Sequence, residues 1–140
     1  MNLDSFNKLV GQTIMECQKI EHDVKLIYAG MLKGEFNKNF NNIKNKALGP
    51  VLVDLEKLDN SDGKPYFKQD DYDLLFQIKD FRNWIVHSSY VDFMYEQGQD
   101  FDRYYRQTYL KLQQFYGRIN HLGDQLERLR LQILKYYGRI

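Results

Sequence analysis

The chain has 140 residues, of which 43% are hydrophobic and 28% are charged, with nine glycines, two prolines and a formal net charge of +1 at pH 7. These values exclude a disordered or collagen-like chain and predict a single folded domain over residues 1–140. The chain has a single cysteine and no cluster of zinc ligands, so we expect no internal disulfide, metal or cofactor. It also has no signal-peptide pattern and no apolar run near 20 residues, which predicts a cytoplasmic protein without a membrane segment.

The first segment repeats its apolar residues at intervals of three and four, which predicts a helix over residues 4–33 that ends near Gly34. The opposite face of this helix is charged, and two interpretations of it stay open. It is either a solvated surface or a face on which Glu21 or His22 looks into a functional cleft.

The middle of the chain predicts a loop and two shorter helices. Residues 35–47 hold five asparagines and predict a loop or a frayed turn, because the asparagine side chain competes for backbone hydrogen bonds. Apolar periodicity returns over residues 50–58 and again over residues 70–87, and each stretch predicts a helix. Residues 88–100 are expected to form an irregular exit and a loose loop.

The last segment predicts a long helix over residues 101–137 with an apolar seam of heptad spacing. This seam packs either inside the chain or against a second copy, and both arrangements stay open. Gly117 and Gly123 lower helix propensity, so we expect a kink or a close helix contact near them. The seam consists of Leu112, Phe115, Ile119, Leu122, Leu126, Leu129, Ile133, Tyr136 and Ile140.

The predicted fold class is all-α, because no segment alternates with the period of a strand. We expect an antiparallel helical bundle of four to five helices that includes the long heptad-patterned C-terminal helix. Charge is uneven along the chain: residues 101–140 hold eight Lys and Arg against three acidic residues, and residues 1–100 hold twelve against sixteen. The basic last segment permits contact with phosphate without requiring it.

The stretch FRNWIVHSSY, at 81–90, is the strongest candidate for chemistry because it mixes charged and apolar side chains at a helix end. We expect Trp84, Ile85 and Val86 to hold the helix in the bundle. A five-residue offset turns about 140° on a helix, so Arg82 and His87 lie on different faces unless the helix breaks after Val86. A two-fold dimer would instead bring two such stretches into one cleft.

Such a cleft suits the cleavage of a phosphodiester. His87 can exchange a proton near neutral pH with a ribose 2′-hydroxyl or with the leaving 5′-oxygen. Arg82 can hold a phosphate oxygen as negative charge builds on phosphorus, and Asn83 can orient the arginine or donate to the same phosphate. The structural alternative pairs Arg82 with an acid and leaves His87 to stabilise the carboxyl end of the helix.

The pattern Arg82-Asn83-x-x-x-His87, after the apolar helix LLFQIKDF, resembles the R-x(4–6)-H signature of the HEPN superfamily. The resemblance implies a helical domain that dimerises at the motif, with Arg82 and His87 as the catalytic pair and Asn83 as their polar support. Many members are metal-independent endoribonucleases that act as toxins or in antiviral defence, and others are non-catalytic RNA-binding or interaction modules. Ser89 stands where the toxin branch paired with nucleotidyltransferase antitoxins has a tyrosine.

The resemblance implies RNA, a second copy of the chain, and an antitoxin or other protein as partners. Tyr90, Arg103, Tyr104 and Arg106 are the further residues that we expect to contact RNA, because tyrosine stacks on bases and arginine binds phosphate. The leading interpretation is therefore a dimeric endoribonuclease, and the alternative is a non-catalytic HEPN-like module. A third interpretation is a structural helical protein that assembles through residues 112–140.

Overall fold

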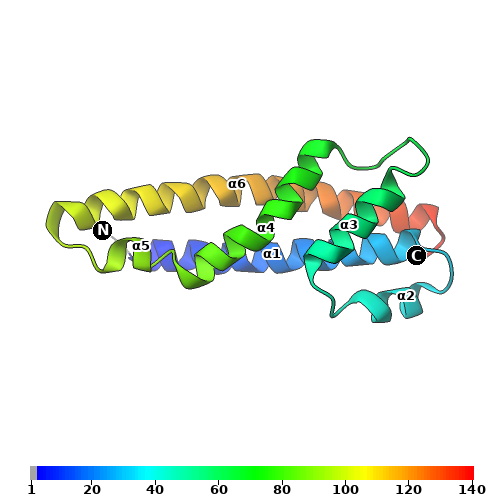
Figure 1. Cartoon of the computed structure of the whole chain (residues 1–140), viewed down its shortest axis with the longest axis horizontal. Helices are drawn as coiled ribbons and strands as arrows, with labels where there is room; N and C mark the ends of the chain where they lie inside the picture. The colour runs from blue at the N-terminus through cyan, green and yellow to red at the C-terminus, as the bar shows by residue number, and fades with distance from the viewer. Residues whose placement is uncertain (1–2) are drawn as a thin grey trace.

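The computed structural model describes residues 3–140 and is helical throughout that range, with no strand in it (Figure 1). The all-α prediction is confirmed, although six helices replace the expected four to five. Two long helices, α1 and α6, lie side by side, and α4 crosses them obliquely on one face. The helices are α1 (Leu3–Met31), α2 (Phe36–Ile43), α3 (Leu48–Asp59), α4 (Gln69–His87), α5 (Val91–Met94) and α6 (Gly98–Tyr136).

The two long helices run parallel to each other, which corrects the prediction of an antiparallel bundle. Lys19 contacts Glu127, Asp23 contacts Arg130, and Arg139 reaches the end of α1, at sequence separations of 108, 107 and 107 to 109. Because the sequence separation between contacting residues stays nearly constant along α1 and α6, the two helices run in the same direction. The reason lies in α4, which runs back across one face of the pair, so that α6 can start at the same end as α1 (Figure 1).

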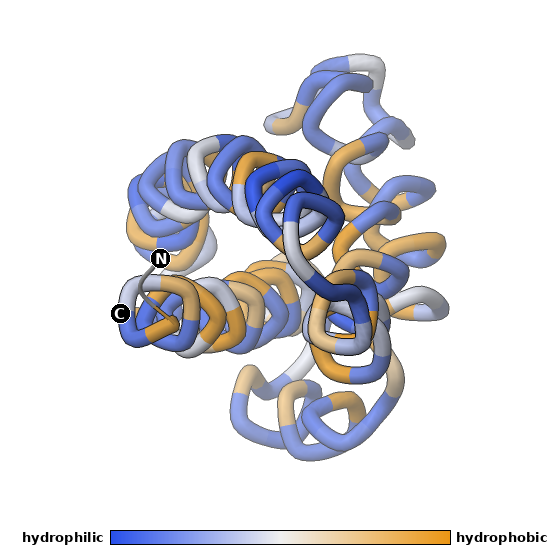
Figure 2. The backbone as a smooth tube through the Cα atoms, turned by 90° about the vertical axis from the view of Figure 1, so that its left-hand side faces the viewer, coloured by the Kyte–Doolittle hydropathy of each residue, from blue (hydrophilic) through white to orange (hydrophobic). Residues whose placement is uncertain are grey.

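The core lies where α1 packs against α6 and where α3 and α4 cover one side of that pair (Figure 2). Most of the α6 seam is buried there within one chain, while Leu129 is half-buried and Tyr136 and Ile140 are exposed. Apolar burial of this kind stabilises a fold by about 25 cal/mol per Å². The buried seam positions are Leu112, Phe115, Ile119, Leu122, Leu126 and Ile133.

Different contacts hold the chain together at the two ends of the α1 and α6 pair. At the amino-terminal end, Phe6 packs edge-on against Phe93, with ring centroids 5.2 Å apart, and Phe93 does the same against Tyr105 at 5.1 Å. At the other end, the Arg139 guanidinium donates to the carbonyl oxygens of Gly30, Leu32 and Gly34 at 2.7 to 3.1 Å. These bonds satisfy carbonyls that the end of α1 leaves without helical partners.

Helix α2 forms where a loop or frayed turn is predicted, so that prediction is wrong. Phe36, Phe40 and Ile43 repeat at helical spacing, and Ile43 is buried. Asn39 has a tertiary role, because its amide donates to the carbonyl oxygens of Ala29, Leu32 and Lys33 at 3.2 to 3.4 Å. Its side chain therefore stabilises the end of α1 and does not compete with the backbone of α2.

The other helix predictions agree with the structure to within a few residues. The largest differences fall in residues 88–100, where the expected loop contains the short helix α5 and the start of α6. Phe93 explains α5, because this side chain is fully buried in the aromatic cluster. The sequence around Phe93 is too short for a periodic signal to reveal such a helix.

A buried carboxylate joins the end of α3 to α4. Asp59 is 2% exposed and accepts hydrogen bonds from the backbone N–H groups of Tyr66 and Phe67, at 2.8 and 3.2 Å. It also accepts the Tyr72 hydroxyl at 2.6 Å. Burial, and then this hydrogen bond, raise the pKa of Tyr72, so the phenol remains the donor. The network fixes the path of the chain into α4.

The two central glycines of α6 have different surroundings, although the helix continues through both. A Cβ on Gly123 would overlap Oε1 of Glu16, so the expected close helix contact occurs at this position. Nothing lies within 4 Å of a Cβ on Gly117. Glu16 is buried against α6, its Oε1 has no hydrogen-bond partner among the described residues, and burial raises the pKa of its carboxyl group.

Alanine at these two positions is expected to have different effects on the free energy of unfolding. Gly117→Ala should stabilise the protein by about 1 kcal/mol, because alanine favours the helix and the new methyl group meets open space. Gly123→Ala should give no such gain, since Glu16 must leave its place. Urea unfolding of both variants measures the difference, and equal stabilisation by the two substitutions would contradict the close contact at Gly123.

Candidate functional site

The RNWIVH stretch forms the last turns of α4, and its side chains divide between the core and the surface. Ile85 is buried and Trp84 is half-buried, so both hold the helix as expected. Val86 is 58% exposed, which corrects the prediction that it packs in the bundle. The difference follows from the helix turn, because residues 85 and 86 point about 100° apart.

Arg82 is anchored to α1 by Glu21. The Arg82 Nη1 donates to Glu21 Oε1, and the two side chains are 35% and 17% exposed. The charged face of α1 has two interpretations, a solvated surface or a face on which Glu21 or His22 looks toward a site. Glu21 faces the motif. His22 instead packs edge-on against Phe40, with ring centroids 5.5 Å apart. A carboxylate in this place fixes the orientation of the guanidinium and leaves its other N–H groups available.

Asn83 and His87 face outward from α4. Both are exposed, they are four residues apart and so lie on neighbouring positions of one face, and no hydrogen bond joins either side chain to another group in the described range. The helix runs through His87, and Ser88 and Ser89 both donate their N–H groups to Trp84. The break after Val86 that would bring Arg82 and His87 together within one chain is therefore not present.

Cys17 lies close to the Arg82 and Glu21 pair but is not suited to act as a nucleophile. It is fully buried, and burial raises the pKa of its thiol to about 12, with a further increase from Glu21. A thiol is nucleophilic only as the thiolate. The titratable group of the motif that is accessible to a substrate is therefore His87.

The four residues expected to contact RNA have different environments. Tyr90 donates its hydroxyl to Asn7 at 2.5 Å and packs edge-on against Phe6, so it contributes to packing. Arg103 is exposed, forms an ion pair with Asp100 at 3.1 Å and lies 4.9 Å from the ring centre of Tyr104. Arg106 is exposed at the surface of α6. Tyr104 lines a pocket together with Trp84.

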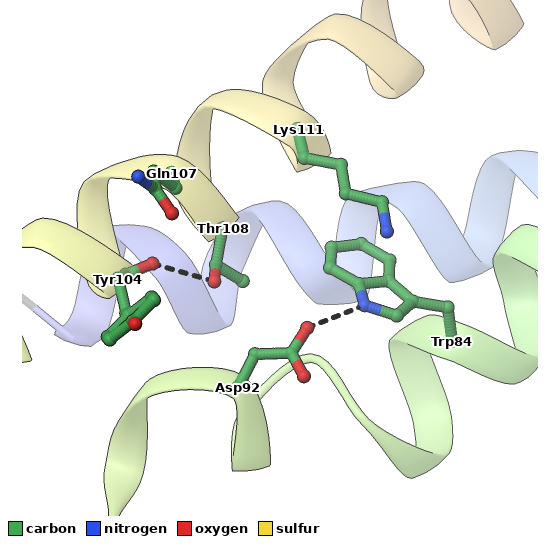
Figure 3. A pocket seen from close by; sticks show the side chains of 6 residues that line it. All are labelled: Trp84, Asp92, Tyr104, Gln107, Thr108 and Lys111. Atoms are coloured by element: carbon green, nitrogen blue, oxygen red, sulfur yellow. Dashed lines mark hydrogen bonds between the residues drawn. The ribbon is translucent and has the colours of Figure 1, made fainter. Parts of the chain in front are cut away.

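That pocket lies between the end of α4, α5 and the first turns of α6 and has a volume of about 310 Å³. Trp84 and Tyr104 stand on opposite sides of it (Figure 3). The indole Nε1 donates to Asp92 Oδ2 at 2.9 Å, and the Lys111 ammonium lies 4.0 Å from the centre of the indole ring. The sequence pattern does not single out Asp92 or Lys111, because only the fold brings them beside Trp84.

No family model, curated protein or solved structure matches this chain significantly. Among residues 3–140, no group of three or more His, Cys, Asp and Glu side chains is arranged to hold a metal ion. Within the same range, no helix is both long and apolar enough to cross a bilayer. The chemistry of the site therefore has to be argued from its own residues.

Proposed function

We propose that this chain is a metal-independent endoribonuclease of the HEPN type that acts on single-stranded or loop RNA as a homodimer. Each scissile phosphate would be held by Arg82 of one protomer and would meet His87 of the partner subunit. Asn83 would support Arg82 or donate to the same phosphate. A role as a toxin or in antiviral defence belongs to the same proposal, because it rests on the resemblance of the motif.

The observation that carries the proposal is the unbroken helix from Arg82 to His87. Because this helix turns the two side chains about 140° apart, one protomer cannot direct both to one phosphate. Glu21 nevertheless holds Arg82 in a fixed orientation, while His87 extends into solvent. An anchored cation and an accessible histidine on different faces favour a site completed by a second copy.

Exposed apolar side chains near the motif support association through this surface. Phe76 lies on the same outward face of α4 as Asn83 and His87, and Val86 is exposed next to His87. Val91 and Met94 of α5 are also more than half exposed. Several exposed apolar groups on one part of a protein surface are typical of an interaction site.

The proposed chemistry is an internal transfer at phosphorus. The ribose 2′-oxygen would form a bond to phosphorus while the bond to the 5′-oxygen breaks, which leaves a 2′,3′-cyclic phosphate and a 5′-hydroxyl end. His87 would accept the proton of the 2′-hydroxyl or donate one to the 5′-oxygen. Arg82 would stabilise the charge that develops on the phosphate oxygens.

A non-catalytic RNA-binding or protein-interaction module is the second candidate. The observation that favours it is the ion pair between Arg82 and Glu21, since a carboxylate that neutralises Arg82 weakens its attraction for phosphate. This candidate predicts no cleavage, together with salt-sensitive RNA binding or a stable complex with another protein.

The test is cleavage of a fluorescent single-stranded RNA in the presence of EDTA. The wild-type protein should cleave it, and Arg82→Ala should lower the rate by at least about 10²-fold, as expected for the loss of a group that stabilises developing charge. Arg128→Ala is the matched control, because Arg128 is an exposed arginine of α6 that belongs neither to the motif nor to the lining of the pocket. Equal rates for wild type and Arg82→Ala would contradict the proposal, and RNA binding without cleavage would favour the second candidate.

A further inference from the structure

The pocket between Trp84 and Tyr104 combines the groups that recognise a nucleobase. Two aromatic rings stand on opposite sides, with Thr108 between them and Gln107 above (Figure 3). Its volume of about 310 Å³ is at the lower end of the range for small-molecule sites. Aromatic side chains stack on bases, and amide, hydroxyl and carboxylate groups read the edges of bases.

We propose that this pocket binds a nucleobase, with a preference for guanine over uracil. The inference deepens the proposed function, because the base would belong to the nucleotide next to the scissile phosphate. Trp84 and His87 are three residues apart on α4 and so lie on neighbouring positions of one helix surface. A base in the pocket would therefore place its own phosphate near His87.

Asp92 is the source of the preference for guanine. One oxygen of its carboxylate accepts the indole N–H, and no hydrogen bond reaches the other oxygen from a described residue. A carboxylate only accepts hydrogen bonds. Guanine presents N1–H and the exocyclic N2 amino group side by side and can donate twice, whereas uracil has a single N–H between two acceptors.

Lys111 is placed to change partners when a base enters. Its ammonium lies over the indole ring, and the residue is exposed where it lines the pocket. A base that stacks on the indole would take the place of the ammonium, and Lys111 could then pair with the phosphate of the same nucleotide. This exchange keeps the phosphate away from the negative charge of Asp92.

Trp84 is the only tryptophan in the chain, so tryptophan fluorescence reports on the surroundings of this one indole ring. The full-length protein would be titrated with guanosine 5′-monophosphate and uridine 5′-monophosphate, with equilibrium dialysis as a second measurement. We expect saturable binding of both nucleotides, with a dissociation constant about 10-fold lower for the guanine nucleotide, as for one bidentate base contact. Equal affinity for the two nucleotides, or no binding of either by dialysis, would overturn the inference.

Three variants separate base recognition from folding and from cleavage. Asp92→Asn keeps an acceptor for the indole N–H and should remove most of the roughly 10-fold preference. Tyr104→Ala should weaken both nucleotides by about 5-fold or more, because one stacking partner is lost. His121→Ala is the control, because His121 is exposed on α6 and does not line this pocket, and it should leave nucleotide binding unchanged. Unchanged binding in Asp92→Asn and Tyr104→Ala would overturn the inference. Nucleotide binding without RNA cleavage by the wild type would reject only the proposed function, and cleavage without nucleotide binding would reject only the pocket.

Discussion

Replacing His87 by alanine is expected to slow RNA cleavage in EDTA by about 10² to 10⁴-fold, the range for loss of a general acid or base. His87 is the accessible proton-exchanging group of the motif, since Cys17 is buried and its pKa is raised to about 12. The substitution should not affect folding, because the side chain is exposed and has no hydrogen-bond partner in residues 3–140.

The matched control for this substitution is His121→Ala. His121 is also exposed and lies on α6, away from the motif, so its loss should change the cleavage rate by less than about 2-fold. Initial rates on the same RNA, and the urea midpoint of each variant, separate a chemical effect from an effect on stability. A His87→Ala protein that cleaves as fast as the His121→Ala protein would remove His87 from the mechanism.

Replacing Asp59 by alanine is expected to lower the free energy of unfolding by about 3–5 kcal/mol, because three donors lose their acceptor in a buried place. The donors are the N–H groups of Tyr66 and Phe67 and the hydroxyl of Tyr72. Since this network fixes the entry into α4, the substitution should also reduce cleavage through misplacement of the motif. Urea unfolding monitored by circular dichroism measures the change in stability.

Asp62→Ala, in the loop that follows α3, is the control for the loss of an aspartate. Asp62 is exposed and accepts only the N–H of Lys64, at 2.9 Å, among the hydrogen bonds of the described chain. Its replacement should change stability by about 0.5 kcal/mol or less. If Asp59→Ala and Asp62→Ala had similar stabilities, the buried network would contribute little to the fold.

The helices that the sequence predicts well are those with long apolar periodicity. The steps of three and four in α1 and α6 span many turns, and most of the residues that they mark are buried in the structure. Helix direction is not encoded in that periodicity, so the parallel arrangement of α1 and α6 could not be read from it. It depends on α4 running back along the pair, which is a property of the whole chain.

The parts that the sequence predicts poorly owe their structure to distant contacts. Helix α2 is supported by Asn39, which bonds to the end of α1, and α5 is supported by the burial of Phe93. Tertiary contacts of this kind override local propensity. Short segments with few apolar residues carry too little periodic signal to predict such contacts.

In the candidate site, too, some residues can be identified from the sequence, whereas others depend on contacts between distant parts of the chain. The composition of RNWIVH identifies Arg82, Asn83 and His87 without reference to the fold, and their catalytic role remains a prediction. The partners of this stretch come from other helices: Glu21 from α1, Asp92 from α5 and Lys111 from α6. Of these three, the sequence indicates only Glu21, because it and His22 lie on the charged face of the predicted first helix.

The central claim, a site shared between two protomers, is tested most directly by mixing two inactive variants. Arg82→Ala and His87→Ala proteins carrying different tags would be combined under conditions that allow subunit exchange. Half of the dimers should then be mixed, and each mixed dimer has one intact Arg82 opposite one intact His87. The account predicts recovery of about a quarter of the wild-type cleavage rate. A mixture that contains the mixed dimer but cleaves no faster than the separate variants would contradict it.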